Sequence, residues 1–440
     1  MKLLFLIPCL ILCQVSYGKQ YKMIEVGTAN RLLEGISIET VQCQQKALQG
    51  NNHNIANIIA NDFSFYVHLF NVLAKNDQEV QAQPDQSYMQ KLLKQRVYYI
   101  ITVNCDDKKL GESIVSLFST KEQKKLVQLN VAMEGPNFRK LVHQVSDNFY
   151  RRITGRESFF SSRIVFVSDQ DSTSEKTIKE LYIMDFDGYN IEKLTSHRGI
   201  VLSPAVSADN RKVLYSLIPE SKIGIKNINL YEVDIATKQT VEISSRKGIN
   251  SGAIYAGDGK GIYLTLSEKG NANIYYMDIK TKQLRAVTNH YSADVDPSLS
   301  LNKNLLTFLS GRSGKANVYT LDPRGTEKSV KRISYVGKFN ATPRFSRDGS
   351  EIVFVSWLEN SFDLFRINAD GQSLVRLTKD FGSNEEPTFS PDGDFIAFTS
   401  QKPLGANKVD QNVYLMNREG KILGALTKSA KRCFSPRFTN

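Results

Sequence analysis

The sequence predicts a mixed α/β domain followed by an all-β six-bladed propeller that its C-terminal strand closes. Three observations predict this fold: a motif that recurs at a nearly constant period, four β-rich runs within each period, and two chain ends that complement each other. A chain of 440 residues also exceeds the usual size of one compact domain. We therefore expect three segments: a signal peptide at 1–18, the N-terminal α/β domain at 19–158 and the propeller at 159–440.

The recurring motif reads Pro-x-apolar-Ser-x-Asp/Asn, and its second copy has alanine in place of proline. The copies start 44 to 49 residues apart, which is the period expected for propeller blades of four strands. They begin at Pro204, Ala253, Pro297, Pro343, Pro387 and Pro436.

Four β-rich runs fill each period. The run after the motif, such as residues 351–356 or 395–400, is almost continuously apolar, which indicates a strand covered on both faces. Asp-Gly pairs beginning at 258, 348 and 392 separate the first two runs and favour tight hairpin turns. Two further runs complete the period, so each repeat is expected to form one four-stranded blade.

The two ends of the repeat region complement each other. Residues 163–170 match the second strand of a later copy but have no Pro-x-Phe-Ser strand before them, whereas Pro436–Asn440 is such a strand with nothing after it. If the last strand completes the first blade, the ring closes and leaves no exposed sheet edge. The alternative is an open β-solenoid, which would need capping units that the sequence does not show.

Residues 19–158 lack the repeat and predict an α/β domain. Apolar residues at helical spacing indicate one helix around 55–63 and a second that ends before Gly155, while 35–41 and 97–105 resemble strands. The polar segment 78–90 contains one proline and is expected to be a loop.

The first 18 residues have the layout of a secretory signal. One basic residue precedes an apolar stretch from Leu3 to Cys13, and the small-x-small tripeptide Ser16-Tyr17-Gly18 follows. The stretch is too short to span a bilayer, so we expect export with cleavage after Gly18. A lipoprotein anchor at Cys13 is the rival interpretation, but bulky Leu12 precedes that cysteine.

Cleavage would leave three cysteines, which allow at most one internal disulfide. Cys43 and Cys105 are the favoured pair because both lie in the N-terminal third of the chain, and Cys433 would remain unpaired. Buried free thiols are an equally good interpretation of the same residues.

Charge and motifs argue against several function classes. The formal net charge is +12, but the lysines are scattered and do not alternate with aromatic residues, so we expect no nucleic-acid binding. The sequence contains no Gly-x-Ser-x-Gly, Walker A or His-Glu-x-x-His motif, and only two of its five histidines fall in the propeller. We expect no enzyme activity, no catalytic residues, no metal and no cofactor.

The chain resembles the TolB family, the periplasmic propeller component of the Tol-Pal system of Gram-negative bacteria. The resemblance rests on residues 151–168, on the string Asp-Phe-Asp-Gly-Tyr-Asn at 185–190 and on residues 202–216. It implies a non-enzymatic periplasmic scaffold that supports outer-membrane integrity and outer-membrane invagination during cell division. It also implies two partners: the lipoprotein Pal at the propeller mouth, and TolA through the mature N-terminal region, here residues 19–27.

The loops that lead into the inner strands are expected to gather around the mouth of the channel. Their tips carry residues of both charge signs, and by the resemblance these are the candidate Pal-binding residues. They are Arg198, Asn250, Asp294, Asp296, Asn340, Thr342, Glu385 and Glu386. The alternative function is a secreted propeller enzyme, a lyase or a hydrolase, that acts on a saccharide or peptide in the central channel.

Overall fold

The computed structural model describes residues 33–439 apart from 42, 44–48, 76–79, 107–108, 110, 221–226, 301, 303, 326, 406–407 and 429–430. The expected signal peptide, the stretch 19–27 that is expected to bind TolA, and Asn440 lie outside the described residues. None of the described helices has both the length and the apolar character needed to cross a membrane.

The N-terminal domain contains a five-stranded mixed sheet with the order β2-β1-β3-β4-β5. Strand β1 runs parallel to both of its neighbours, and β3, β4 and β5 continue as an antiparallel meander. The bounds are β1 (Glu34–Thr40), β2 (Phe70–Lys75), β3 (Val97–Cys105), β4 (Glu112–Ser119) and β5 (Lys124–Ala132).

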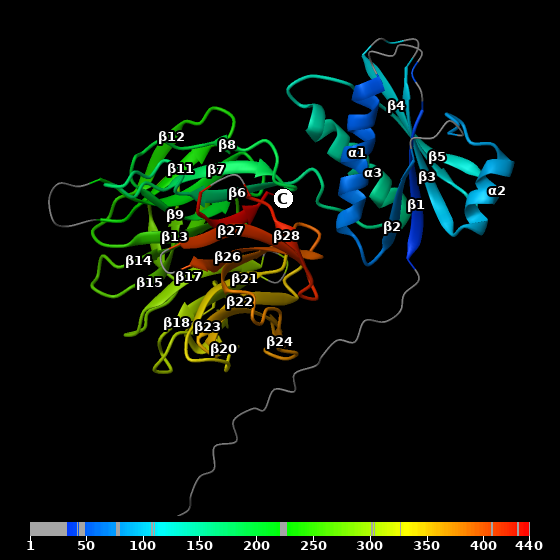
Figure 1. The fold of residues 1–440 in the computed structure, drawn as a ribbon. Coiled ribbons are helices and arrows are strands. Elements are labelled where there is room, and N and C mark those ends of the chain that lie inside the picture. Colours follow the sequence, from blue (N-terminus) through cyan, green and yellow to red (C-terminus); the bar gives the residue numbers. More distant parts are fainter. Residues whose placement is uncertain are drawn as a thin grey trace, which may run out of the picture.

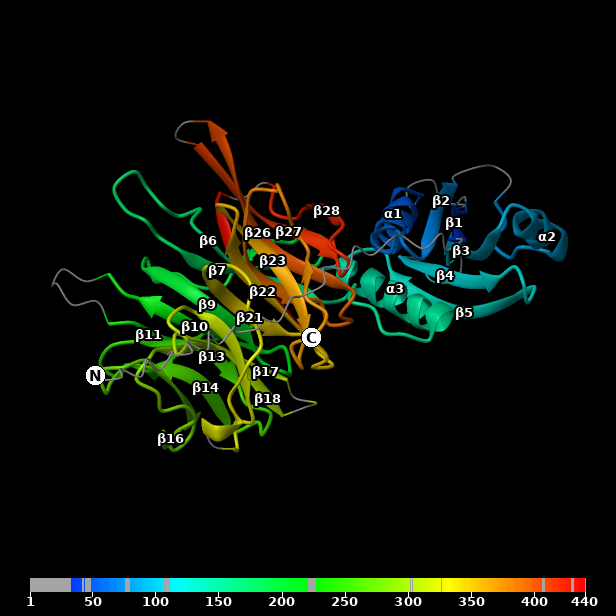
Figure 2. The ribbon, with the colours of Figure 1, turned by 90° about the horizontal axis from the view of Figure 1, so that it is seen from below.

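Two long helices, α1 (Gln49–Phe65) and α3 (Phe138–Thr154), lie on the face of the sheet that is nearer the propeller (Figures 1 and 2). Both form where the apolar spacing predicts them, and α3 ends at Gly155, which adopts the left-handed conformation of a helix C-cap. The apolar faces of α1 and α3 are buried against β1 and β3 in one common core.

The prediction of a loop over 78–90 is wrong at its end, because α2 (Gln86–Lys94) begins there. The carboxylate of Asp85 accepts a hydrogen bond from the Tyr88 N–H and caps the helix. Met89 and Leu92 are buried beneath it. The helix has only two buried apolar residues, and its first turn lies in the polar segment 78–90, so its sequence shows too little apolar periodicity to predict a helix.

The choice between a disulfide and free thiols is settled in favour of the disulfide. Cys43 and Cys105 are joined across a sequence separation of 62 residues. Cys433 carries a free, buried thiol, and burial raises its pKa to about 11. The bridge ties the segment that follows β1 to the end of β3.

Six four-stranded sheets follow the N-terminal domain, and they form the predicted propeller (Figure 1). One blade contains β9 (Ile200–Val206), β10 (Lys212–Ile218), β11 (Asn229–Asp234) and β12 (Thr240–Ser244). The blade after it contains β13 (Asn250–Tyr255), β14 (Gly261–Leu266), β15 (Asn273–Asp278) and β16 (Leu284–Ala286). A third contains β17 (Asp294–Ser300), β18 (Leu305–Ser310), β19 (Asn317–Leu321) and β20 (Lys331–Arg332). The next two comprise β21 (Asn340–Phe345), β22 (Glu351–Leu358), β23 (Ser361–Asn368) and β24 (Val375–Arg376); β25 (Ser383–Phe389), β26 (Phe395–Gly405), β27 (Lys408–Asn417) and β28 (Ile422–Ala425).

The C-terminal strand closes the ring, as predicted. The closing blade has the order β29-β6-β7-β8, in which β29 (Cys433–Phe438) pairs with β6 (Arg163–Ser168). β7 (Glu180–Asp185) and β8 (Glu192–Lys193) complete it. β29 begins before the motif proline Pro436, and the Thr439 N–H donates to the Arg163 carbonyl at 2.8 Å, so the two ends of the propeller are held in register.

The two domains share one hydrophobic core. Tyr66, which directly follows α1, packs against Phe159 and Phe160 of the connecting segment and against Phe395 of β26, and all four side chains are buried. The hydroxyl of Tyr66 donates to the Asp392 carboxylate in the β25–β26 turn at 2.5 Å. Removing this much aromatic surface from water favours one fixed arrangement of the domains.

The Asp-Phe-Asp-Gly-Tyr-Asn string lies in the turn after β7 and holds the same junction. Arg139 of α3 binds the carboxylates of Asp185 and Asp187 at 3.4 and 2.5 Å. Asn61 of α1 donates to Asp187 at 3.3 Å, and Asn190 donates to Asp185 at 2.7 Å. The string therefore has a structural role, because it connects the closing blade to both long helices.

Candidate binding site in the propeller channel

Each of the six inner strands carries a β-bulge at the same place. The residue before the motif proline, together with the proline or its Ala253 replacement, is skipped in the pairing register. Proline is tolerated at a bulge because its missing N–H removes no ladder bond there. The residue before it adopts the left-handed conformation, with φ between 44° and 59°, at Ser203, Gly252, Asp296, Thr342, Glu386 and Ser435.

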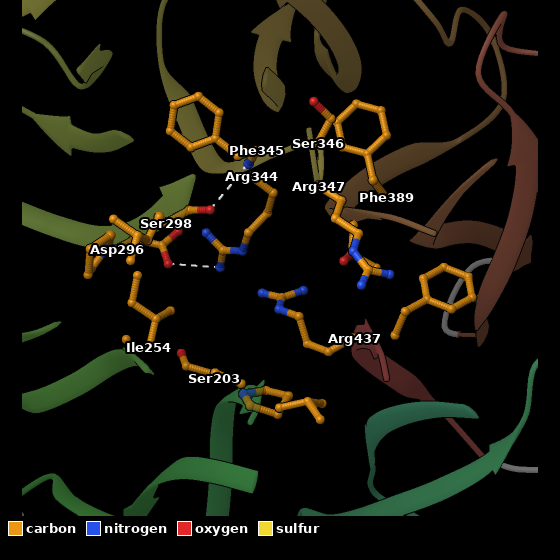
Figure 3. A pocket seen from close by; sticks show the side chains of 18 of the residues that line it. Ser203, Ile254, Asp296, Ser298, Arg344, Phe345, Ser346, Arg347, Phe389 and Arg437 are labelled. Carbon is orange, nitrogen blue, oxygen red and sulfur yellow. Dashed lines mark hydrogen bonds and ion pairs between the residues drawn. The ribbon is translucent and has the colours of Figure 1, made fainter. Parts of the chain in front are cut away.

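The bulges direct the residue after each proline toward the channel. These six residues line a cavity of about 240 Å³ in the middle of the ring: Ala205, Ile254, Ser298, Arg344, Thr388 and Arg437. Figure 3 shows the side chains of Arg344 and Arg437 extending into this cavity from opposite sides, with Arg347 close by. The charged residues in the described lining are three arginines and one carboxylate, that of Asp296.

The two arginines differ in their partners. Arg344 donates through Nη2 to the Asp296 carboxylate of the preceding blade at 2.8 Å. Arg437 is only 8% exposed, and its one described hydrogen bond goes from Nη1 to the carbonyl of its neighbour Pro436 at 2.6 Å. Among the described residues, no carboxylate forms an ion pair with Arg437.

Electrostatics reflect this difference. Burial, and then the like charge of Arg344, lower the pKa of Arg437 to about 9, against the opposing attraction of Glu386 and Asp296. A guanidinium whose pKa is about 9 still carries its proton near pH 7, so the cavity holds a buried positive charge without a bonded counter-ion.

The cavity lies toward the side of the ring where the N-terminal domain attaches. Its lining includes Ser390 and Pro391, which directly precede Asp392, the acceptor of the Tyr66 hydroxyl. Turns between the first and second strands and between the third and fourth strands of a blade lie on one face, because adjacent strands are antiparallel. The loops that lead into the inner strands therefore lie on the opposite face.

Three of the predicted partner-binding residues have fully buried side chains that face the interior of the protein. Asn250, Asp294 and Asn340 occupy the third position before the motif proline, where all six residues of the ring are 0% exposed. Asn340 donates to the carbonyls of Ala316 and Val336, both at 3.2 Å, and Asp294 accepts from Arg312 at 2.8 Å. These bonds hold neighbouring blades and loops together, so the three side chains cannot reach a partner in this conformation.

Three other predicted residues, Asp296, Thr342 and Glu386, are the bulge residues themselves and are partly buried. The Glu386 carboxylate accepts from the N–H and the hydroxyl of Ser435 in the next blade at 2.6 and 2.5 Å. Asp296 holds Arg344 of the next blade in the same way. Of the eight predicted residues, only Asp296 lines the cavity.

The remaining two predicted residues, Arg198 and Glu385, lie outside the bulges. Arg198 is exposed in the loop before β9, and its backbone N–H donates to Glu180 at 2.6 Å. Glu385 is partly buried, and burial followed by the charge of Glu386 raises its pKa. The structure thus leaves Arg198 as the one exposed charge among the eight predicted residues, whereas Glu385 is partly buried, as the bulge residues are.

The sequence reasoning missed the arginines of the cavity, although a signal for them was present. The motif reads Pro-Arg-Phe in only two of its copies, at Pro343 and at Pro436. In the other four copies, the residue that follows the motif proline, or Ala253 in its place, is uncharged. A charge that breaks the repeat pattern at a channel-facing position marks a special site, but which position faces the channel depends on the bulge.

A second cluster of ionisable residues lies at the domain junction. Asp62, His143 and Asp187 place one possible metal ligand atom each within 4.8 Å of one another. Burial raises the pKa of Asp62 to about 6; burial lowers the pKa of His143, but the Asp62 carboxylate outweighs this and the net shift is upward. Asp62 binds His143 at 3.0 Å and Arg139 binds Asp187 through Oδ2, whereas Asp187 Oδ1 is buried and has no hydrogen-bond partner among the described residues.

The fold and the cavity define a class: a closed six-bladed propeller whose channel is basic, fixed to a small α/β domain. A family model described as the TolB beta propeller domain matches residues 150–363. The Tol-Pal system protein TolB of Francisella tularensis subsp. mediasiatica (strain FSC147) is 29% identical over 278 residues, which cover 62% of this chain and 62% of that protein. The chain's match thus spans less than two thirds of this relative.

Solved structures agree on the fold. The crystal structure of TolB from Acinetobacter baumannii superposes with a TM-score of 0.76 at 24% identity and covers 94% of this chain and 98% of that one. A chain of a nidogen/laminin complex covers 63% of this chain and 98% of its own, with a TM-score of 0.50 at 12% identity. The fold that the sequence motifs indicated is confirmed, and residues 150–363 match the TolB beta propeller domain.

Proposed function

We propose that this chain is a non-enzymatic periplasmic scaffold of a Tol-Pal system, which binds Pal and TolA and so supports outer-membrane integrity and invagination at cell division. The observation that carries the proposal is the closed propeller, whose sequence matches the TolB beta propeller domain over residues 150–363. Curated relatives named Tol-Pal system protein TolB add support through their sequence similarity.

Pal binding is assigned to the propeller face formed by the loops that lead into the inner strands. On this face, Arg198 is exposed and Glu385 is partly buried, so both can contribute to a polar interface. The bulge residues Asp296, Thr342 and Glu386 lie deeper and would line the floor of that interface. Asn250, Asp294 and Asn340 would act indirectly, by fixing the loops in place.

TolA binding is assigned to the mature N-terminal region, and the segment boundaries remain those expected: 1–18, 19–158 and 159–440. Support for communication between the two binding regions comes from the junction. The core around Tyr66 and the Arg139 ion pairs with Asp185 and Asp187 join the domains, so a change on one side can be transmitted to the other.

The test is capture of the mature protein by immobilised Pal. We expect capture by the native protein and a loss of about tenfold or more in affinity for the double variant Arg198→Glu with Glu385→Lys, because charged residues at an interface core carry a large share of its specificity. Asp294 is unsuitable for charge reversal, because it is buried against Arg312 and its change would disturb the fold.

The matched control is Arg324→Glu, a charge reversal at an arginine whose side chain is 72% exposed on the outer part of a blade. It should bind Pal like the native protein. Release of the mature protein by osmotic shock would support the periplasmic location. Failure of the native protein to bind Pal at any salt concentration would contradict the proposed function and favour an enzymatic role.

A further inference from the structure

We propose that the propeller channel is a binding site for an oxyanion, a carboxylate or phosphate group, which Arg437 and Arg344 hold between them. This goes beyond the scaffold function and does not depend on it. The site lies in the channel toward the N-terminal domain, whereas Pal was assigned to the opposite face.

The first argument is the unpaired charge. The side chain of Arg437 is only 8% exposed. Arg344 forms an ion pair with the Asp296 carboxylate at 2.8 Å, whereas no carboxylate of the described residues forms an ion pair with Arg437. A buried charge without a bonded counter-ion is unfavourable, and a ligand of opposite charge would offset that cost. The fork of donors in a guanidinium matches the two oxygens of a carboxylate or phosphate.

The second argument is the shape of the cavity. The residues that take the place of an arginine in neighbouring blades are small, namely Ala205, Ser298 and Thr388, and this leaves a volume of about 240 Å³ beside the two guanidinium groups. That volume suits a small anion or the end of an acidic side chain. It is below the range of about 300–1,000 Å³ typical of sites for larger organic ligands.

The third argument is the polar lining. The Ser298 hydroxyl accepts from the Phe345 N–H at 3.2 Å, so its own hydrogen can be donated. Exposed Arg347 stands at the cavity rim and adds positive charge along the way in. The negative groups that face Arg437 are Asp296 and Glu386, and both already accept bonds, from Arg344 and from Ser435 respectively.

The pKa of Arg437, lowered to about 9, agrees with this geometry, because it reports burial and the repulsion from Arg344. Binding of an anion would reverse the shift. An arginine with a purely structural role is expected to form an ion pair with a carboxylate of the protein, as Arg376 does with Asp363 at 2.7 Å in the same propeller.

The experiment uses the mature full-length protein at constant ionic strength. Inorganic phosphate and citrate probe free anions, and a hexaglutamate peptide probes an acidic segment of a protein; binding is measured by calorimetry and by the rise in melting temperature. We expect saturable binding of at least one probe and an increase of about tenfold or more in its dissociation constant for Arg437→Gln, since charge-assisted bonds to a guanidinium are lost.

Arg324→Gln, at the exposed arginine, is the control and should bind as the native protein does. Arg344→Gln serves as a second variant and should also weaken binding, so the test survives if Arg437→Gln does not fold. Binding of the free anions assigns a small oxyanion as the ligand, and binding of the peptide alone assigns an acidic segment. The proposal is overturned if none of the three probes binds, or if binding is unchanged in every folded channel variant.

Discussion

Two positions in each inner strand, three residues before the motif proline and one residue after it, behave in opposite ways. The earlier position is fully buried in all six blades, and at Asn250, Asp294, Asn340 and Asn384 its polar side chain bonds to neighbouring blades and loops. The later position faces the channel and carries a charge only at Arg344 and Arg437. A polar residue that recurs around the ring serves the fold, whereas one that breaks the repeat marks a site.

The aspartates in the turns between the first and second strands of the blades show the same contrast. Hydrogen bonds within their turns lower the pKa of Asp209, and they outweigh burial to lower the pKa of Asp348. At Asp392, burial raises the pKa to about 6, because the N-terminal domain covers this turn; the hydrogen bond from Tyr66 opposes the shift without cancelling it. The exception again marks a special contact, here the domain junction.

The largest effect is expected from removing the partner of a recurring buried residue. Arg312→Gln leaves the fully buried Asp294 carboxylate without its cation, and we expect the free energy of unfolding to fall by about 3–5 kcal/mol in urea unfolding. Arg324→Gln, at an exposed ion pair, should change it by less than about 1 kcal/mol. Equal effects of the two substitutions would break the comparison.

A smaller effect is expected at Asp392. The pKa of Asp392 in the folded state is about 6, above the usual value of 3.8, so between pH 3.8 and pH 6 the folded state binds a proton that the unfolded state has released. This contribution to stability is fully present below pH 3.8 and is lost as pH rises through 6. Asp392→Asn should therefore gain stability relative to the native protein between about pH 4 and about pH 7.5, on the order of 2–3 kcal/mol.

Urea unfolding of both proteins at several pH values measures this difference. Asp209→Asn is the matched control, because the pKa of Asp209 is lowered and its stability contribution is lost in the other direction, as pH falls. A stability difference between Asp392→Asn and the native protein that does not change with pH would show that the junction does not perturb this carboxyl group.

The smallest effect is expected at Asn340. Replacement by alanine removes donors to two carbonyls, and the unfolding free energy should fall by about 1–2 kcal/mol. Asn289→Ala, at an exposed asparagine, should change it by less than about 0.5 kcal/mol. If Asn340→Ala is as stable as Asn289→Ala but loses Pal binding, this recurring position has a binding role after all.

The period of the motif and the complementary chain ends were enough to predict the closed ring, because each blade buries its apolar strands only against its neighbours. The N-terminal helices followed from their apolar spacing, except for short α2, whose cap at Asp85 lies inside a polar stretch. The candidate residues were less predictable. Asn250, Asp294 and Asn340 look like loop tips in the sequence, but the inner strands begin at or before them.

The sequence by itself determined the number of blades and the closure by the last strand, because these depend on period and pattern. Only the tertiary structure decided that Cys43 pairs with Cys105, that the bulges turn Arg344 and Arg437 into the channel, and that Asp392 lies under the N-terminal domain. The physical reason is that burial and pairing depend on which residues, far apart in the chain, come together around each group.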